Sequence, residues 1–401
     1  MDFNFQKNYD IVVAGAGVAG IAAALAAARR GHKVCLLEKQ CLIGGLATSG
    51  LIYIYLPLCD GKGTQLTFGI SEEMLKKSLE YSPFDIGEKF GGIPGGNATR
   101  PNRYAVDFSP AGFTLSLDEL LLDAGVDLWL DTRLCAVQKA ADGKVTALEV
   151  ENASGRGKIS AEYFVDASGS ADVVRFAGGQ VENGDNYRAV WMIERVPGEN
   201  LHYHFTDQIR VKAIGNSYDT GIFTNDANNS RVVTDFTRNS WAMAREYYKK
   251  SYAEGTTNRY NHYPLHLPAM PQFRKIARIY GVETLDSDSH WQHYDSSVGL
   301  YGDWRNSGKV YETPYGTLIP QDVYGVLAAG RCISATGDAW EAYRVIPSAA
   351  MTGEVAGVAA SLAVEQAREA RDFSAETVRG ELRKNNFKFH FEEAGITPPQ
   401  N

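Results

Sequence analysis

The sequence predicts an α/β fold organised around a strand–helix–strand unit that binds a dinucleotide. Four glycine-containing blocks support this prediction, at residues 9–39, 44–50, 163–169 and 324–331. The first block reads YDIVVAGAGVAGIAAALAAARRGHKVCLLEK. In it a short apolar strand over 11–14 enters a glycine-rich turn, a helix of small residues runs to about residue 30, and a second strand over 33–37 ends on Glu38. This order is typical of parallel sheets that hold a pyrophosphate.

Each residue of the first turn has a physical role in such a unit. Gly15 would make the tight turn, Gly17 would let the backbone approach a pyrophosphate, and Gly20 would let helix and strand pack closely. The helix then offers free N–H groups and its positive dipole end to the phosphates. Glu38 follows at the distance where a carboxylate accepts both hydroxyls of a ribose, and its charge disfavours a 2′-phosphate. The alternative is a glycine-rich turn that binds nothing, which this context disfavours.

The remaining blocks indicate that distant parts of the chain meet at the same ligand. Residues 44–50, GGLATSG, provide a second close backbone approach, which simple NAD dehydrogenases do not usually need. Residues 163–169, YFVDASG, predict a strand that ends in a small-residue turn beside the first phosphate loop. Residues 324–331, YGVLAAGR, predict another strand, followed by a small-residue helix from Pro347 to about residue 363. Proline suits the first turn of a helix, where its missing N–H costs nothing.

The segments GAGVAG, EKQCLIGGLATSG, VDASGSADVV, MPQFRKIARIYG and LAAGRCISATGDAWEAYRVIPSAAMTGEVAG together resemble the FAD-dependent oxidoreductases of the glutathione-reductase-like class. Within that class they resemble flavoproteins related to fumarate reductase and succinate dehydrogenase. The resemblance implies FAD as the cofactor and a glutathione-reductase-like Rossmann FAD domain with an inserted α+β substrate-binding cap domain. Matched by motif, it implies as FAD-binding residues Gly15, Ala16, Gly17, Ala19, Gly20, Glu38, Lys39, Gly44, Gly45, Ala47, Ala167, Gly169, Gly330, Arg331 and Asp338.

Leu134 and Asp338 also bear on the expected cofactor site. In relatives the strand that corresponds to the one carrying Leu134 presents backbone groups to the adenine ring, so Leu134 is added to the expected cofactor residues. Many relatives have His-Glu where this chain has Gly337 and Asp338, so the chain departs from the family pattern where a ribityl contact is expected.

The chain divides into three stretches. Residues 1–180 and 319–401 are expected to form the two parts of the FAD domain, the second ending in a charged helix over 374–394. Residues 181–318 are expected to form the cap, because six of the eight histidines lie at 202–293 and four of the six tryptophans at 191–304. In this stretch the segment MPQFRKIARIYG would place Arg274 and Arg278 one turn apart on one helix face. Two arginines at that spacing could bind an anion together, or each could form an ion pair with a neighbouring carboxylate.

The composition of the chain limits the kinds of partner that the protein is expected to bind. The 401 residues carry 40 basic and 48 acidic side chains, and a net charge of −8 argues against a nucleic-acid surface. Five cysteines without a CxxC exclude a disulfide framework, a zinc ribbon and a redox pair, which favours the cytoplasm. Neither a targeting segment nor a membrane helix is expected. The expected partners are a small-molecule substrate and an unidentified electron donor or acceptor, and a homo-oligomer is possible.

The candidate catalytic groups lie beside the helix that starts at Pro347. Arg344 and Tyr343 precede it, and Arg344 would hold a substrate carboxylate or carbonyl, or else pair with a neighbouring acid. The backbone of Ser348 and Ala349 would stabilise negative charge at N1–C2=O of the flavin.

The cap supplies two candidate bases and no expected metal site. Either His290 or His293 would act as the general base, although a structural role is the alternative for each. Metal is not expected, because no HxxxH with a nearby carboxylate or cysteine completes a ligand set.

These observations favour hydride transfer between flavin N5 and a small polar organic substrate, with dehydrogenation of a CH–OH group as the first hypothesis. Reduction of an activated C=C bond, of fumarate-reductase-like type, is the second. Dicarboxylate reduction itself is not expected, because Arg344 does not align with the catalytic arginine of the fumarate reductases. A hypothesis of another class is an electron-relay flavoprotein subunit without its own small-molecule substrate.

Overall fold

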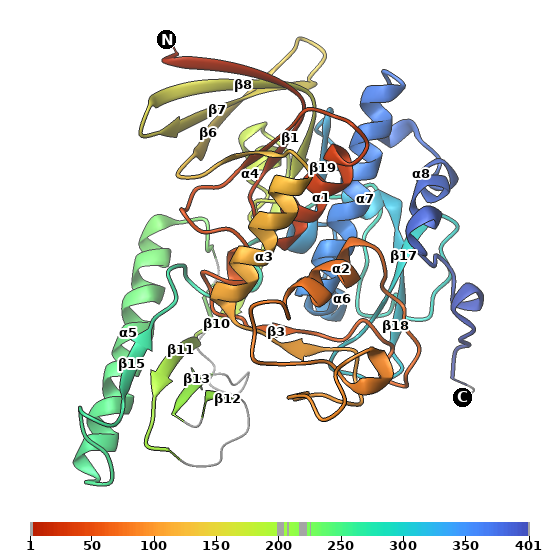
Figure 1. The fold of residues 1–401 in the computed structure, drawn as a ribbon. Coiled ribbons are helices and arrows are strands. Elements are labelled where there is room, and N and C mark those ends of the chain that lie inside the picture. The colour runs from red at the N-terminus through yellow and green to blue at the C-terminus, as the bar shows by residue number, and fades with distance from the viewer. Residues whose placement is uncertain (1–2, 199–203, 207, 216–222, 225, 400–401) are drawn as a thin grey trace.

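The central sheet is parallel, as the glycine-rich blocks predict. The computed structural model describes residues 3–198, 204–206, 208–215, 223–224 and 226–399. Five parallel strands adjoin in the order β5 (Asp127–Trp129), β2 (Val34–Leu37), β1 (Phe5–Ala14), β8 (Gly155–Asp166) and β19 (Val326–Ala328). The first part of β8 also pairs antiparallel with β7 (Val145–Asn152), which pairs with β6 (Arg133–Lys139). The fold is therefore mixed α/β, and residues that are far apart in the sequence meet at one sheet edge (Figure 1).

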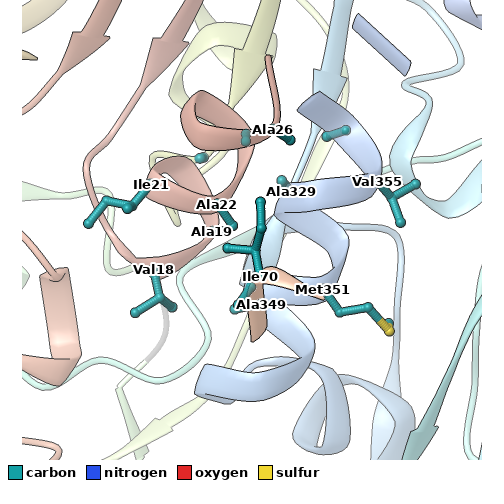
Figure 2. Close-up of a cluster of buried hydrophobic side chains, with 14 of the residues drawn as sticks. Val18, Ala19, Ile21, Ala22, Ala26, Ile70, Ala329, Ala349, Met351 and Val355 are labelled. Carbon is teal, nitrogen blue, oxygen red and sulfur yellow. The ribbon is translucent and has the colours of Figure 1, made fainter. Parts of the chain in front are cut away.

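The helices α1 (Val18–Ala28) and α7 (Ile346–Glu365) pack directly against each other beside this sheet. Figure 2 shows small side chains of α1, such as Ala19 and Ala22, facing α7. Alanine and glycine allow this close approach: a Cβ added at Gly353 would lie 2.1 Å from the carbonyl oxygen of Ala19. Nearly all of α7 is buried, which explains why apolar and small residues occur on all of its faces. The small-residue pattern of both helices thus reflects packing inside the protein.

A second, antiparallel sheet lies apart from the first, with the long helix α5 (Ser230–Ala253) beside it (Figure 1). Its strand order is β12 (His204–Thr206), β13 (Ile209–Ile214), β11 (Val190–Arg195) and β15 (Tyr263–His266). By contrast, Val298, Tyr301 and Tyr311 share the core of α1 and α7, through the hairpin of β17 (Ser297–Gly302) and β18 (Val310–Pro314). That residues 181–318 form a separate domain stays a prediction.

The other elements are short. The remaining helices are α2 (Ile70–Lys77), α3 (Pro110–Asp123), α4 (Asp172–Phe176), α6 (Gly337–Tyr343) and α8 (Ala375–Leu382). The remaining strands are β3 (Ile54–Tyr55), β4 (Val106–Asp107), β9 (Val181–Asn183), β10 (Asn186–Tyr187), β14 (Phe223–Thr224) and β16 (Ala277–Ile279). In the parts of the chain that the structure describes, no single helix is long and apolar enough to cross a membrane. The pair α6 and α7 passes that test together, with an 84° bend between them.

Two predicted helices are wrong. The segment around Arg274 and Arg278 is extended and ends in β16, because the amides of Arg274 and Lys275 donate to the Asn186 side chain, at 2.7 and 2.9 Å, in place of helical carbonyls. Arg278 pairs instead with Glu182 on β9.

The second wrong helix is the one predicted over 374–394. The α-helix ends at Leu382, and the backbone at Asn386 is left-handed. The chain then turns Phe387 and Phe389 into the core.

Candidate cofactor and substrate cavities

A cavity at the carboxyl ends of the parallel strands gathers most of the residues expected to bind the cofactor. Its walls come from three separate segments: the loops after β1 and β2, the turn after β8, and the turn after β19 with the start of α7. Among the residues expected to bind the cofactor, those that line it are Gly15, Gly17, Ala19, Glu38, Lys39, Gly44, Gly45, Ala47, Ala167, Gly169, Gly330, Arg331 and Ala349.

Two of the expected residues shape the cavity without lining it. Gly20 lies under the turn, where a Cβ would stand 1.8 Å from the carbonyl oxygen of Gly15. Ala16 is buried, and its amide donates to Glu38 while its carbonyl accepts from Gly44 at 2.7 Å. Gly15 itself has φ +101°, a conformation that glycine adopts readily. The two glycine loops therefore lie side by side with no side chain between them.

Glu38 occupies the position expected of a ribose acceptor. Its Oε2 accepts from the amide of Ala16 and its Oε1 from the amide of Gln40, each at 3.0 Å. Burial raises the pKa of this carboxyl, and the two amide donors oppose that effect. Glu38 also borders a second recess, together with Thr132, Arg133 and Leu134, so Leu134 lies where the adenine ring is expected. These contacts hold the carboxylate at the end of β2 in a fixed orientation.

We expect Glu38→Gln to weaken FAD binding about tenfold, because a charged acceptor of two hydroxyls becomes a neutral one. Titration of the apoprotein with FAD, followed by quenching of flavin fluorescence, measures this. Asp338→Asn is the matched control, since the Asp338 side chain is 46% exposed and paired with Arg305 and Lys309. Unchanged affinity in Glu38→Gln, or an equal loss in both variants, would contradict the ribose assignment.

The start of α7 differs from the expectation in one respect. The helix begins at Ile346, and the amide of Ala349 donates to the carbonyl of Val345 at 2.9 Å, so the expectation that this amide is free for a ligand is wrong. The amides of Ile346 and Ser348 lie in the first turn, where a helix offers no acceptor of its own. The Ser348 hydroxyl is buried against the carbonyls of Ala342 and Val345. The helix start still faces the cavity through Val345 and Ile346.

A larger cavity of about 540 Å³ adjoins the first. Both are lined by the same five residues at their junction: Leu46, Ala47, Arg344, Val345 and Ile346. Trp191, Trp304 and Tyr187 supply flat walls, and an apolar part is formed by Ile52, Ile54, Leu56 and Pro57. Its charged lining consists of arginines alone: Arg100, Arg103, Arg274, Arg305 and Arg344. Within the described part of the chain, no carboxylate, imidazole, lysine or thiol lines this cavity.

Arg344 stands at the junction, as expected, and is held in place by an acid. Its Nε donates to Oε2 of Glu341 at 2.7 Å, and Lys275 approaches the other oxygen of Glu341 at 2.9 Å. Although burial raises the pKa of Glu341, the charges of Arg344 and Lys275 outweigh it and lower that pKa to about 2. The acid is therefore charged at neutral pH, and it fixes the guanidinium beside the expected position of the flavin ring.

Three other candidates lie outside both cavities. Tyr343 is fully buried, and its hydroxyl bonds to Thr313 at 2.7 Å, because α6 turns this side chain toward Tyr301 and Tyr311. His290 contacts the carbonyl of Ser287 at 3.1 Å. Asp338, expected at the ribityl chain, points to Arg305 and Lys309 instead. The geometry gives these three side chains no contact with the expected cofactor or substrate.

His293 is exposed and also lies outside the cavities. It forms a cluster with Glu312 and His390, whose candidate ligand atoms lie within 4.8 Å of one another, a set that could hold a metal ion. Nδ1 of His390 lies 3.1 Å from Glu312, and Nε2 of His293 lies 3.2 Å from Asp295. Burial lowers the pKa of His293, but the charges of Glu312 and Asp295 raise it above its usual value. Sequence spacing did not reveal this cluster, because its members are far apart in the chain.

Sequence reasoning missed most of the larger cavity. Arg103, Trp191 and Trp304 come from three separate segments, and nothing in their local pattern marks them. The concentration of tryptophan between residues 191 and 304 was the one available signal. The sequence pattern does single out Arg274, but it predicts a helix for this segment, and that helix does not form.

A family model described as FAD dependent oxidoreductase matches residues 10–267 and 280–382. The chain belongs to this family. Its cofactor is accordingly FAD, and the lining of the first cavity fits that ligand through its glycine-rich backbone and buried acid. The chain is thus an FAD-dependent oxidoreductase, and we expect the sheet edge, Glu38 and the start of α7 to contact the flavin nucleotide.

Curated relatives match over shorter stretches. The chain is 28% identical over 209 residues to a vinyl phenol reductase of Lactiplantibacillus plantarum, which covers 45% of this chain and 40% of that protein. It is 39% identical over 74 residues to a thioredoxin reductase of Ureaplasma parvum, which covers 18% of this chain and 24% of that protein. The chain therefore spans less than half the length of these two relatives.

Solved structures resemble the chain over almost its whole length at low identity. A geranylgeranyl bacteriochlorophyll reductase-like protein of Thermoplasma acidophilum covers 98% of this chain, and the match covers 89% of that protein, with a TM-score of 0.49 and 16% identity. A p-nitrophenol 4-monooxygenase of Pseudomonas putida covers 94%, and the match covers 87% of that protein, with a TM-score of 0.49 and 12% identity.

Proposed function

We propose that this protein reduces an activated C=C bond of a small organic substrate held in the larger cavity, with FAD in the first cavity. Bound FAD would supply hydride transfer at its N5 atom. The observation that carries the proposal is that the larger cavity opens onto the first at Arg344 and that its charged lining is made of guanidinium groups alone. A substrate at this junction would lie beside the start of α7 and beside Arg344.

The lining favours reduction over dehydrogenation of a CH–OH group, the first hypothesis from the sequence. Oxidation of an alcohol needs a base that takes the hydroxyl proton, and imidazole or carboxylate usually fills that role. Guanidinium groups do the opposite: they bind an electron-withdrawing group and stabilise the negative charge that develops on the substrate when a hydride arrives. The relative named vinyl phenol reductase, as its name says, acts on a vinyl phenol, which is in line with this direction.

The chain's own groups have distinct roles in this proposal. Arg344, fixed by Glu341, would stabilise the negative charge that develops on the substrate at the junction. Trp191 and Trp304 would hold its flat face, and the apolar wall beyond Leu46 would exclude water. The first-turn amides of α7 would stabilise negative charge on the reduced ring. The guanidinium of Arg344 keeps its protons, so the proton that completes the reduction would come from solvent.

We extend the proposal to the surroundings of the site. The fold would be of the glutathione-reductase-like class, with residues 181–318 as the cap. This is supported by Tyr187, Trp191 and Arg274, which reach the larger cavity from that stretch. An external donor would supply the electrons, and the protein would act in the cytoplasm. The proposal holds for a monomer and for a homo-oligomer alike.

Anaerobic mixing tests the direction of the reaction. The reduced yellow holoenzyme is mixed with unsaturated acids, unsaturated ketones and vinyl phenols, and the oxidised holoenzyme with secondary alcohols, sugars and hydroxy acids. We expect an unsaturated compound to reoxidise the flavin and so to restore its absorption at about 450 nm. Bleaching of the oxidised enzyme by an alcohol would overturn the proposal in favour of a dehydrogenase. Exchange with electron carriers alone would favour a relay subunit.

A further inference from the structure

The larger cavity holds two arginines that lack an acidic partner among the described residues. Arg100, Arg305 and Arg344 each pair with a carboxylate, those of Asp107, Asp303 and Glu341, respectively. For Arg274 and Arg103, no ion pair with a carboxylate exists among the residues that the structure describes. The Arg103 side chain donates a long hydrogen bond, 3.5 Å, to the carbonyl of Trp304. The cavity is therefore not electrically neutral.

Arg274 is the more informative of the two, because it is buried. The residue is 8% exposed, its Nη1 donates to the carbonyl of Gln272 at 3.0 Å, and its guanidinium lies 5.6 Å from the ring centre of Trp191. Burial, together with the nearby charges of Arg344 and Arg331, lowers the pKa of Arg274 to about 10. A buried cation without a counter-ion is costly, so a site of this kind is stabilised when an anion enters it.

The backbone that carries Arg274 is held firmly. Its amide and that of Lys275 donate to Oδ1 of Asn186, and the Gln272 side chain accepts from the amide of Trp191 at 2.8 Å. The same Gln272 side chain donates to the carbonyl of Gly50, beside the second glycine loop. The guanidinium is thereby positioned before any ligand binds, and such preorganisation raises affinity.

A further donor lies on the same wall. Nε1 of Trp191 is buried and has no hydrogen-bond partner among the described residues. An indole N–H is a donor only, so an acceptor oxygen of a ligand would satisfy it. A buried guanidinium, a flat indole ring and an apolar part of the lining favour a planar molecule with an anionic end.

We propose that the substrate of the larger cavity is a planar unsaturated carboxylic acid, whose carboxylate binds Arg274 and accepts from Trp191 Nε1. This rests on the proposed function, since it names the class of molecule that the same cavity takes. The guanidinium matches a carboxylate with two parallel hydrogen bonds. Arg103 adds positive charge to the cavity and draws the anion in.

Calorimetric titration of the oxidised holoenzyme tests the proposal without turnover. The probes are three acids and their neutral amides: cinnamate and cinnamamide, benzoate and benzamide, fumarate and fumaramide. We expect at least one acid to bind about tenfold or more tightly than its amide, which is the range for a charge-assisted pair. Arg274→Gln should remove this difference and leave the affinity of the amide unchanged, while Arg274→Lys should restore part of it.

Arg195→Gln is the matched control. Arg195 lies on β11 of the same region, donates to Gln208 at 3.1 Å and lines neither cavity, so its loss should not alter binding of any probe. If Arg274→Gln fails to retain flavin, Arg103→Gln serves in its place, with a smaller loss of acid affinity expected. Equal binding of every acid and its amide would overturn the proposal, as would equal losses of acid and amide in Arg274→Gln.

Failure of the proposed function would look different. In that case the acids would still bind more tightly than the amides, but none of the unsaturated acids would reoxidise the reduced flavin. The binding preference and the direction of electron flow are thus measured separately.

Discussion

Replacing Gly20 with alanine is expected to lower the free energy of unfolding by about 3 kcal/mol or more, the size seen when a packed interior is overfilled. The added Cβ would stand 1.8 Å from the carbonyl oxygen of Gly15 and 3.2 Å from the Cβ of Ala167. Neither neighbour can move freely, because the first is backbone and the second belongs to the turn after β8. Helix α1 would have to leave the sheet. Urea unfolding followed by circular dichroism measures the loss.

Gly17→Ala is the matched control in the same turn. A Cβ at Gly17 meets nothing within 4 Å, and its φ of −73° suits any residue. We therefore expect the apoprotein to keep its stability and the affinity for FAD to fall, because the methyl group enters the cavity where the pyrophosphate should lie. If Gly17→Ala binds FAD as tightly as the unaltered protein, the placement of the pyrophosphate at this turn is wrong. If Gly20→Ala is as stable as the unaltered protein, the close packing of α1 is wrong.

Glu354→Gln is expected to stabilise the protein at alkaline pH by roughly 2–3 kcal/mol. Glu354 is buried in α7, and burial raises its pKa to about 7. Its Oε2 accepts from the amide of Ile70 and its Oε1 from Asn385, each at 2.6 Å. These two donors lower the pKa, but burial outweighs them, so the folded state binds this proton more tightly than the unfolded state. The stability contributed by the protonated acid is lost as the pH rises from about 4.5 to about 7.

Urea unfolding of both proteins at pH 5 and pH 8.5 checks this expectation. The variant should gain most at pH 8.5, where the unaltered protein must bury a charge, and little at pH 5. Glu365→Gln is the control on the same helix: the salt bridges to Arg30 and the contact with His32 lower the pKa of Glu365, so its loss should bring no gain at alkaline pH. A difference between Glu354→Gln and the unaltered protein that does not change with pH would contradict the raised pKa.

The convergence of the expected cofactor residues on one cavity was largely predictable, because it depends on short segments. The turn of Gly15, Gly17 and Gly20 requires particular backbone conformations and particular free space, and these requirements appear in the sequence as glycine at fixed spacing. Glu38 at the end of β2 and the turn at Gly330 after β19 follow the same logic. Each prediction needed only local structure and the rule that the carboxyl ends of parallel strands meet at one edge of a sheet.

The substrate cavity was not predictable in the same way. The segment around Arg274 has helical spacing of its charges, yet its amides bind Asn186, almost ninety positions earlier in the chain. Tyr343 and His290 have the side chains that proton transfer needs, but α6 directs one into the core and the other contacts Ser287. Which way a side chain points depends on packing partners that a local pattern does not contain.

The sequence by itself determined the family, the cofactor and the parallel sheet, because glycine spacing and apolar strands record backbone constraints that act over a few residues. The tertiary structure alone decided which charged groups surround the substrate. Guanidinium groups from five separate positions converge beside Trp191 and Trp304, and acids pair with three of them and leave Arg103 and Arg274 without an acidic partner among the described residues. That balance of charge arises from contacts between distant segments, and it is the basis for our proposal that this site reduces an unsaturated acid.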